Sequence, residues 1–234
     1  MCGRYSLVAD QKVLENRYNA RFPKETTVRY NVAPTQKMSI LRNNKESEGD
    51  FWKWGLIPSW SINDAAGANL INIRSENLFS KNTFKNLVQS QRCLIPADGF
   101  YEWKKELKSR IPYRFTLPDE SIFSFAGIWD EWQYEDGSKI GTFGIITREA
   151  IGEIKDIHDR MPVILNRDAE KIWLHALLSE NDIKDIFAKH SITQLNHYKA
   201  HRSVNSSSID SPECIAIAPK IYPGETYSLF DFNS

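Results

Sequence analysis

Two reactive groups meet at the second residue of the chain. The sequence begins Met1-Cys2-Gly3, and an initiator methionine that precedes a small residue is commonly removed. Loss of Met1 leaves Cys2 with a free α-amine beside its thiol. The reference pKa of an α-amine is about 7.7–8.0, so roughly 10–20% of it is unprotonated at pH 7. This amine can attack an aldehyde, and the thiol can then close on the imine carbon to form a thiazolidine ring.

Other reactive side chains give weaker signals. The alternative for Cys2 itself is that it lies on an ordinary frayed terminus. The remaining cysteines, Cys93 and Cys214, are too few and too scattered for a disulfide framework or a paired-cysteine zinc motif. We expect Cys93 to be a buried structural thiol and Cys214 to lie in a strand. Because no third ligand accompanies His197 and His201, no metal site and no cofactor is expected.

The elements that position such a terminus are predicted from hydrophobic spacing. Residues 52–56 and 113–117 alternate apolar with polar or small side chains, and 122–146 predicts a hairpin that turns at Asp136-Gly137. Helices are predicted where apolar residues recur three or four positions apart, over residues 10–22, 82–91, 168–178 and 183–187. We expect these helices to cover a sheet.

The whole chain, residues 1–234, is interpreted as one domain. Hydrophobic residues make up 41%, aromatic residues 12% and charged residues 26% of the sequence, a composition that excludes disorder as the main state. Prolines interrupt runs that would otherwise be long, which favours a bent, antiparallel sheet over regularly alternating parallel βαβ units. The predicted fold is therefore α+β, with a curved, mostly antiparallel β-sheet or barrel and covering helices.

Charge and targeting signals limit the partners and the location. Thirty basic residues balance thirty acidic ones, but residues 1–37 hold seven basic and three acidic side chains and residues 71–110 hold eight and four, so each stretch is net +4. If the two stretches meet in space they form a basic surface; the alternative is a solvated mixture. No apolar run approaches the ~20 residues of a membrane span, and no secretory signal is recognised. We expect a cytoplasmic protein that acts as a monomer.

Seven short motifs follow one another along the chain: MCGRYS at the start, NVAPTQ (31–36), WGLIPSW (54–60), NIRSEN (72–77), RCLIPADGFYEWKK (92–105), FAGIWDEW (125–132) and IHDRMPVIL (157–165). Together they resemble the SRAP family, the SOS-response-associated peptidases or abasic-site processing proteins, over nearly the whole chain. The resemblance implies a single α+β domain that binds single-stranded DNA carrying an abasic site. It also implies that the N-terminal cysteine crosslinks covalently to the ring-opened sugar aldehyde and shields the lesion.

The resemblance assigns the reacting groups, and their chemistry fits the assignment. Cys2 is the nucleophile, with its amine forming the Schiff base and its sulfur the ring. Imine formation takes a proton from the ammonium and delivers one to the leaving hydroxyl, for which a carboxylate and an imidazole are suited. Glu102 and His158 match those positions, and Asn72 is expected to hydrogen-bond at the reacting sugar. The alternatives are an ion pair of Glu102 with a neighbouring lysine, a structural His158 and a turn-capping Asn72.

Three arginines are expected to hold the DNA. Arg4, Arg74 and Arg160 carry guanidinium groups, which bind phosphate oxygens bidentately. Arg74 and Arg160 lie two residues from Asn72 and His158, and in an extended segment that spacing directs both side chains of each pair to one face. The alternative is ion pairing at the surface, above all for Arg160, which follows an aspartate.

Pro34, Trp60 and Thr147 complete the predicted DNA-binding set. Pro34 and Trp60 could form an apolar platform against unstacked bases, whereas Trp54, which opens the same motif as Trp60, is expected in the core. A small residue is usual between the asparagine and arginine of the NIRSEN motif in the family. Ile73 is therefore expected to narrow the site beside that asparagine.

Other functions stay open at this level. Met-Cys-Gly also opens N-terminal-nucleophile glutamine amidotransferases, in which the free amine is the base for thiol attack on an amide. A thiol peptidase would use Cys2, His158 and Glu102 as a Cys-His-acid set, above all to remove Met1. A strand-cleaving lyase reaction could follow from the same Schiff base. The last alternative is a non-covalent binder of single-stranded DNA, from which denaturant releases the DNA.

Overall fold

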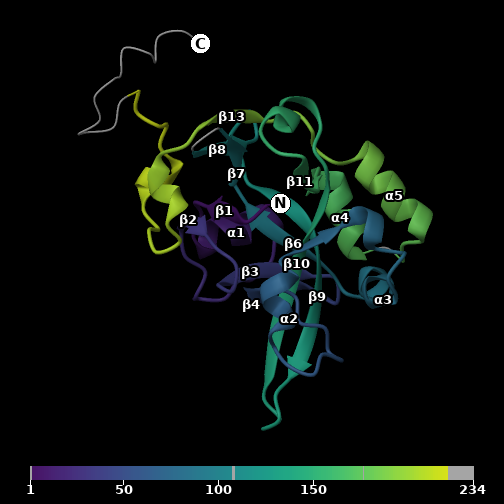
Figure 1. Ribbon diagram of the computed structural model, residues 1–234. Helices are drawn as coiled ribbons and strands as arrows, with labels where there is room; N and C mark the ends of the chain where they lie inside the picture. The colour runs from purple at the N-terminus through teal and green to yellow at the C-terminus, as the bar shows by residue number, and fades with distance from the viewer. Residues whose placement is uncertain (1, 107–108, 176, 221–234) are drawn as a thin grey trace.

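A closed ring of five strands forms the centre of the molecule (Figure 1). The computed structural model describes residues 2–106, 109–175 and 177–220. The ring runs in the order β10-β4-β3-β6-β9 and returns to β10, because β9 and β10 also pair with each other. Only the β4–β10 pair of the ring is parallel. Its members are β3 (Lys37–Arg42), β4 (Lys45–Trp54), β6 (Arg92–Ala97), β9 (Phe123–Gln133) and β10 (Lys139–Glu149). This barrel confirms the predicted α+β class.

Short strands lie on both sides of the end of β10. Strand β5 (Asn72–Arg74) pairs in parallel with one side of β10, and β11 (Arg160–Pro162) pairs antiparallel with the other side. Thr147 of β10 therefore faces Arg74 on one side and Pro162 on the other. Strand β12 (Ile164–Leu165) continues from β11 and pairs with β9. As a result, β10 aligns two segments that are far apart in the sequence.

A second, antiparallel sheet continues from the barrel. Its order is β13 (Asn196–Lys199), β8 (Arg110–Thr116), β7 (Gly99–Lys105), β1 (Arg4–Leu7) and β2 (Arg29–Val32). One residue, Asp98, separates the end of β6 of the barrel from the start of β7, so the two sheets share a continuous stretch of chain. Because β1 pairs with β7, the residues that follow Cys2 are fixed beside the GFYEW motif.

Helices cover the outside of the barrel, as the sequence predicted. The α-helices are α1 (Gln11–Tyr18), α2 (Ala66–Asn69), α3 (Asn82–Ser90), α4 (Arg167–His175) and α5 (Glu180–Lys189). Figure 1 shows α3, α4 and α5 on one side of the barrel and the segment after β13 on the opposite side. Helix α5 begins with a capping box formed by Ser179 and Asp182. Helix α1 is shorter than predicted, because Asn19 adopts a left-handed conformation with φ of 51° and ends it.

The predicted hairpin is confirmed, whereas the strand predicted around Cys214 is not. Strands β9 and β10 form the hairpin, and Gly137 in its turn has φ of 83°, which a glycine adopts readily. The prediction that Cys214 lies in a strand is wrong. Cys214 lies in the 3₁₀ helix η4 (Pro212–Ile215), which begins at a proline. The other 3₁₀ helices are η1 (Ser75–Asn77), η2 (Gly152–Asp156) and η3 (Arg202–Asn205).

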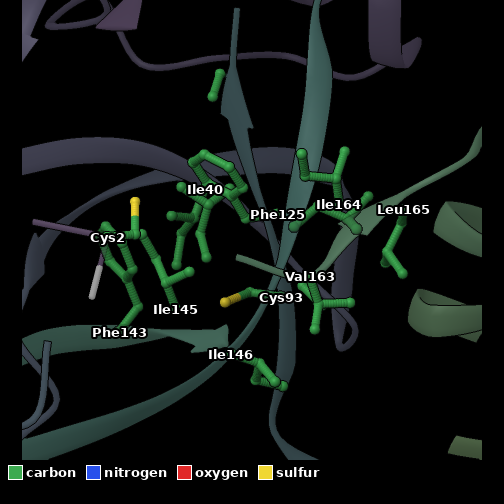
Figure 2. Packing of buried hydrophobic residues seen from close by; sticks show 14 of the residues in the cluster. Cys2, Ile40, Cys93, Phe125, Phe143, Ile145, Ile146, Val163, Ile164 and Leu165 are labelled. Carbon is green, nitrogen blue, oxygen red and sulfur yellow. The ribbon is translucent and has the colours of Figure 1, made fainter. Parts of the chain in front are cut away.

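The main core fills the barrel and the space beneath the second sheet. Tyr5 from β1 packs edge-on against Trp54 from β4 and Phe125 from β9, with ring centroids 5.2 and 5.7 Å apart. Cys2 and Cys93 belong to the same cluster and are fully buried (Figure 2). These positions confirm the predictions that Trp54 is a core residue and that Cys93 is a buried thiol.

The two basic stretches meet, but three of their arginines are ion-paired or buried. Arg4 faces Tyr101 across strands β1 and β7, which brings the stretches together. Arg17 and Arg29, however, are held in ion pairs, and Arg92 is buried. Within the described residues, no helix has the length and apolarity that a membrane crossing requires.

Candidate active site

Cys2 lies fully buried in the hydrophobic cluster, just before β1 begins at Arg4. Figure 2 shows it in that cluster together with Phe143 and Ile145 of β10. Its thiol points toward the carbonyl oxygen of Arg4, with 3.8 Å between sulfur and oxygen. Burial, and then the carboxylate of Glu102, raise the pKa of the Cys2 thiol far above its ordinary value. The thiol is therefore neutral at physiological pH.

Asn72 is held beside Cys2 by β5. Its side-chain Nδ2 donates a hydrogen bond of 2.8 Å to the backbone carbonyl of Cys2, and its Oδ1 is buried with no hydrogen-bond partner among the described residues. Strand alternation places Ile73 on the opposite face, where it is buried against Gly144. The expectation that Ile73 narrows the site is therefore wrong, because its side chain points away from Asn72 into the barrel.

Glu102 lies in the middle of β7 and is 2% exposed. Burial is the largest cause of its raised pKa, from 4.5 to about 7. The carboxyl is thus divided between its two protonation states near neutral pH. A group with this pKa can both accept a proton from an amine and return one.

His158 faces Glu102 from the turn between η2 and β11. Its Nε2 lies 3.8 Å from Glu102 Oε2. The backbone N–H of Arg160 donates to His158 Nδ1 at 3.0 Å, while the exposed carboxylate of Asp159 lies 2.9 Å from the same nitrogen. One ring nitrogen cannot accept from Arg160 and donate to Asp159 at once. The amide always carries its hydrogen and Asp159 is free to point into water, so Nδ1 is the acceptor and the neutral ring carries its hydrogen on Nε2, toward Glu102.

The order of proton affinities at Glu102 and His158 is the reverse of the usual one. Burial lowers the pKa of His158 below 6.5, whereas the pKa of Glu102 is raised to about 7. Near pH 7 the imidazole is neutral while the carboxyl still holds part of its proton. Glu102 is consequently the better proton carrier of the two at neutral pH, and His158 is a hydrogen-bond donor.

Arg160 occupies a different environment from the one predicted. It is buried, and its two terminal nitrogens donate to the two carboxylate oxygens of Glu76 at 2.7 and 3.0 Å. One of these nitrogens also donates to the carbonyl of Thr147 at 2.8 Å. His158 lies outside a strand, so the predicted alternation that would direct His158 and Arg160 to one face does not apply. Thr147 is fully buried as well, so its side chain is not exposed to DNA.

Arg4 is held against the segment after β13. Its Nη1 donates to Asn31 Oδ1 and to the carbonyl of Val204, both at 2.8 Å. Asn31 is fully buried and its amide donates to the carbonyls of Ser206 and Ile209 at 2.9 and 2.7 Å. Arg4 thus joins β1 to this segment, and its guanidinium is only partly exposed.

Arg74, Trp60 and Pro34 reach the surface. Arg74 shares a face of β5 with Asn72 and is exposed. Trp60 lies in the loop after β4 with 68% of its surface exposed, and Pro34 is half-buried. Of the predicted DNA-binding residues, these three are the ones that present a side chain to solvent, beside the partly exposed Arg4.

Sequence reasoning missed Glu76 and Asn31. Both lie inside motifs that the sequence singled out, NIRSEN and NVAPTQ, but each acts on a partner far along the chain. Neither motif is apolar, so no local contrast in the sequence marks Glu76 or Asn31 as the partner of a distant arginine. Among the described residues, no cluster of three or more histidine, cysteine, aspartate or glutamate side chains could hold a metal ion.

Known proteins share both the sequence pattern and the fold. The family model SOS response associated peptidase (SRAP) matches residues 1–207. The chain is 36% and 37% identical to the abasic site processing proteins YoqW and YoaM of Bacillus subtilis (strain 168), over 92% of this chain and 99% and 97% of theirs. It is 28% identical to the abasic site processing protein HMCES of Xenopus tropicalis, over 80% of this chain and 65% of that protein.

A solved structure of a protein from Bacteroides thetaiotaomicron superposes with a TM-score of 0.82 and 26% identity, over 93% of this chain and all of that one. With the family model covering most of the sequence and the two Bacillus subtilis relatives matching along nearly their full length, this chain belongs to the SOS response associated peptidase (SRAP) family.

Proposed function

We propose that this protein captures abasic sites in single-stranded DNA through Cys2, after removal of Met1. The observation that carries the proposal is the meeting of Cys2, Asn72, Glu102 and His158, which come from four separate segments. Asn72 Nδ2 lies 2.8 Å from the Cys2 carbonyl and His158 Nε2 lies 3.8 Å from Glu102 Oε2, while the carboxylate of Glu102 helps to raise the pKa of the Cys2 thiol. The curated relatives that match along their full length are named abasic site processing proteins. An abasic sugar in its open form carries the aldehyde that an aminothiol traps.

The crosslink forms in two steps that together release one water. The unprotonated α-amine of Cys2 attacks the aldehyde carbon, and the resulting carbinolamine loses water to give an imine. The Cys2 sulfur then adds to the imine carbon, and the thiol proton passes to the nitrogen. The product is a thiazolidine, in which nitrogen and sulfur of one residue both bond to the former aldehyde carbon.

Glu102 and His158 have complementary roles in these proton transfers. Glu102, with a pKa of about 7, accepts the proton of the α-ammonium, whose reference pKa is about 7.7–8.0, and returns it to the leaving hydroxyl. His158 offers its Nε2 hydrogen to the sugar oxygen during ring opening. Asn72, whose Oδ1 is buried without a partner in the described residues, accepts a hydrogen bond from the sugar.

The residues of the predicted DNA-binding set have two roles, contact with the DNA and support of the site. Arg74 binds a phosphate directly, and Trp60 and Pro34 contact unstacked bases. Arg4, Arg160 and Thr147 act mainly by shaping the site, because each is held by partners inside the protein. The Schiff base also opens a route to strand cleavage by β-elimination, which makes a weak lyase activity part of the proposal.

A thiol peptidase is the second candidate, limited to removal of Met1. The favourable observation is the placement of Cys2 beside Glu102 and His158. Cleavage of other proteins is disfavoured, because burial raises the pKa of the Cys2 thiol and the thiolate is the attacking form. Conversion of Met1-containing protein to the shorter form in a purified Cys2→Ala variant would show that the Cys2 thiol does not perform the removal.

The test is intact mass before and after mixing with a single-stranded oligonucleotide that contains one abasic site. We expect wild-type protein without Met1 to gain the oligonucleotide mass less one water, in a complex that resists denaturant. Cys2→Ala retains an α-amine but no sulfur, so it should give only an imine that survives when reduced with borohydride. Cys93→Ala, which removes another fully buried thiol, is the matched control and should crosslink normally.

Three results would contradict the proposal. A denaturant-resistant adduct in Cys2→Ala without reduction would reject the thiazolidine. Wild-type protein that binds the DNA but releases all of it in denaturant would leave a non-covalent binder. Hydrolysis of glutamine by wild-type protein, lost in Cys2→Ala and unaccompanied by any adduct, would favour an amidotransferase-like enzyme.

A further inference from the structure

A bidentate ion pair crosses strand β10 and joins the two sides of the candidate site. Arg160 Nη1 donates to Glu76 Oε1 at 2.7 Å, and Nη2 donates to Oε2 at 3.0 Å. Glu76 lies in η1, directly after the β5 strand that carries Asn72, whereas Arg160 begins β11. Because β5 and β11 pair with opposite sides of β10, the side chains of this pair bridge the strand between them.

The guanidinium of Arg160 is fixed by more than the ion pair. Nη2 also donates to the carbonyl of Thr147 at 2.8 Å, in the strand that the bridge crosses. Arg160 is buried, while the side chain of Glu76 is half-exposed. A planar guanidinium group that donates to both the carboxylate and the carbonyl has little freedom to rotate. The side chain of Arg160 is therefore an anchor for its own backbone.

The backbone that is anchored contacts His158. The N–H of Arg160 donates to His158 Nδ1 at 3.0 Å, which makes that nitrogen an acceptor and leaves the ring hydrogen on Nε2. Nε2 lies 3.8 Å from Glu102 Oε2. A chain of contacts thus runs from Glu76 through Arg160 to Nδ1 of the imidazole. The opposite edge of the ring, at Nε2, points to Glu102.

We infer that Glu76 is a positioning residue: its carboxylate holds Arg160, and through the Arg160 amide it fixes the orientation and tautomer of His158. The role of His158 in crosslinking rests on the proposed function. The positioning itself is a property of the free protein and can be measured without DNA. Nothing in this role requires Glu76 to touch the sugar or the reacting atoms.

The direct readout is nitrogen NMR of protein labelled with ¹⁵N-histidine. In wild-type protein, His158 should show the ¹⁵N signals of a neutral ring that carries its hydrogen on Nε2 and has an unprotonated, hydrogen-bond-accepting Nδ1. In Glu76→Ala these signals should move toward the average of the two tautomers, because Arg160 then loses both hydrogen bonds to the carboxylate and keeps only the one to the Thr147 carbonyl. Glu149→Ala is the matched control: its carboxylate is exposed, its backbone in β10 pairs directly with Arg160 in β11, and it should leave the signals unchanged. Unchanged His158 signals in Glu76→Ala would overturn the inference.

The second readout is the crosslinking rate in two backgrounds. Glu76→Ala should slow the reaction by roughly tenfold, a part of the about 10²- to 10⁴-fold that a positioned acid–base group supplies. In a His158→Ala background the same substitution should have no further effect. An equal loss in both backgrounds would overturn the inference, because Glu76 would then act independently of His158.

Two safeguards keep the outcomes distinct. If Glu76→Ala does not fold, Glu76→Gln takes its place, since glutamine has nearly the same size but lacks the charge and one accepting oxygen. If wild-type protein forms no crosslink, the proposed function fails, and the NMR comparison still decides whether Glu76 positions His158. If wild-type protein crosslinks and both readouts are unaffected by Glu76→Ala, only the role of Glu76 is rejected.

Discussion

The side-chain amide of Asn72 donates a 2.8 Å hydrogen bond to the backbone carbonyl of Cys2. Asn72→Asp keeps the shape of the side chain but replaces the donor with a carboxylate that repels the carbonyl. A lost hydrogen bond to a buried group costs about 1–3 kcal/mol, so we expect the crosslinking rate to fall roughly 5- to 150-fold. Gel analysis of adduct formation over time measures this change. Asn77→Asp, in the same motif, is the control, and equal rates for both variants would argue against a specific role for Asn72.

Glu102 should make the stability of the fold depend on pH. Its pKa is raised from 4.5 to about 7 by burial, so between these values the folded state binds more protons than the unfolded state. The free energy of unfolding therefore decreases as pH rises through this window, by roughly 3 kcal/mol for a shift of about 2.5 pH units (7 − 4.5). The glutamine in Glu102→Gln cannot ionise, so the free energy of unfolding of this variant does not show this decrease.

The measurement is urea denaturation of wild type and Glu102→Gln at pH 5 and pH 8. The variant should gain about 2–3 kcal/mol relative to wild type between the two pH values, while its crosslinking rate falls. A difference between the two proteins that does not change with pH would contradict the raised pKa of Glu102.

Arg74 and Arg160 should respond differently to substitution by alanine. Arg74 is exposed, so its loss should leave the free energy of unfolding nearly unchanged and reduce the salt dependence of DNA binding by about one phosphate contact. Arg160 is buried in an ion pair with half-exposed Glu76, so its loss should cost about 1–3 kcal/mol of stability. Binding titrations at several salt concentrations, with urea denaturation alongside, separate the two effects. A lower salt slope in Arg160→Ala at unchanged stability would restore Arg160 as a direct phosphate ligand.

Asn31 should control how firmly the segment after β13 is attached. Its buried amide donates to the carbonyls of Ser206 and Ile209 and accepts from Arg4. Asn31→Ala removes these hydrogen bonds, at a cost of about 1–3 kcal/mol for each group that stays buried without another partner. Hydrogen exchange should then accelerate in residues 203–210 and hardly change in α5. Uniform acceleration throughout the chain would instead indicate a global loss of stability.

Local signals in the sequence predicted local structure well. The β9–β10 hairpin follows from alternating apolar residues on both sides of Asp136-Gly137, and α3, α4 and α5 follow from their apolar spacing. Alternation misled the prediction for Cys214, because Pro212 begins a 3₁₀ turn that the apolar pattern does not reveal.

Contacts between residues that are far apart in the sequence could not be predicted from local spacing. Closure of the barrel depends on the parallel pairing of β4 with β10, which joins residues 53–54 to residues 142–143. The ion pair of Arg160 with Glu76 spans 84 positions in the sequence. Motifs therefore indicated which residues gather at the site, whereas the burial of Arg160 and Thr147 could be learned only from the fold.

The double pairing of β10 sets a dimension of the molecule. Asn72 and Arg160 stand on ladders at either side of this strand, and adjacent strands are separated by about 4.8 Å because the peptide group fixes that spacing. Strands β5 and β11, on either side of β10, are thus roughly 10 Å apart, which is twice the spacing between neighbouring strands and does not depend on their side chains. Because main-chain geometry sets this spacing, it is preserved when many side chains are replaced. This agrees with the TM-score of 0.82 against a protein whose sequence is only 26% identical.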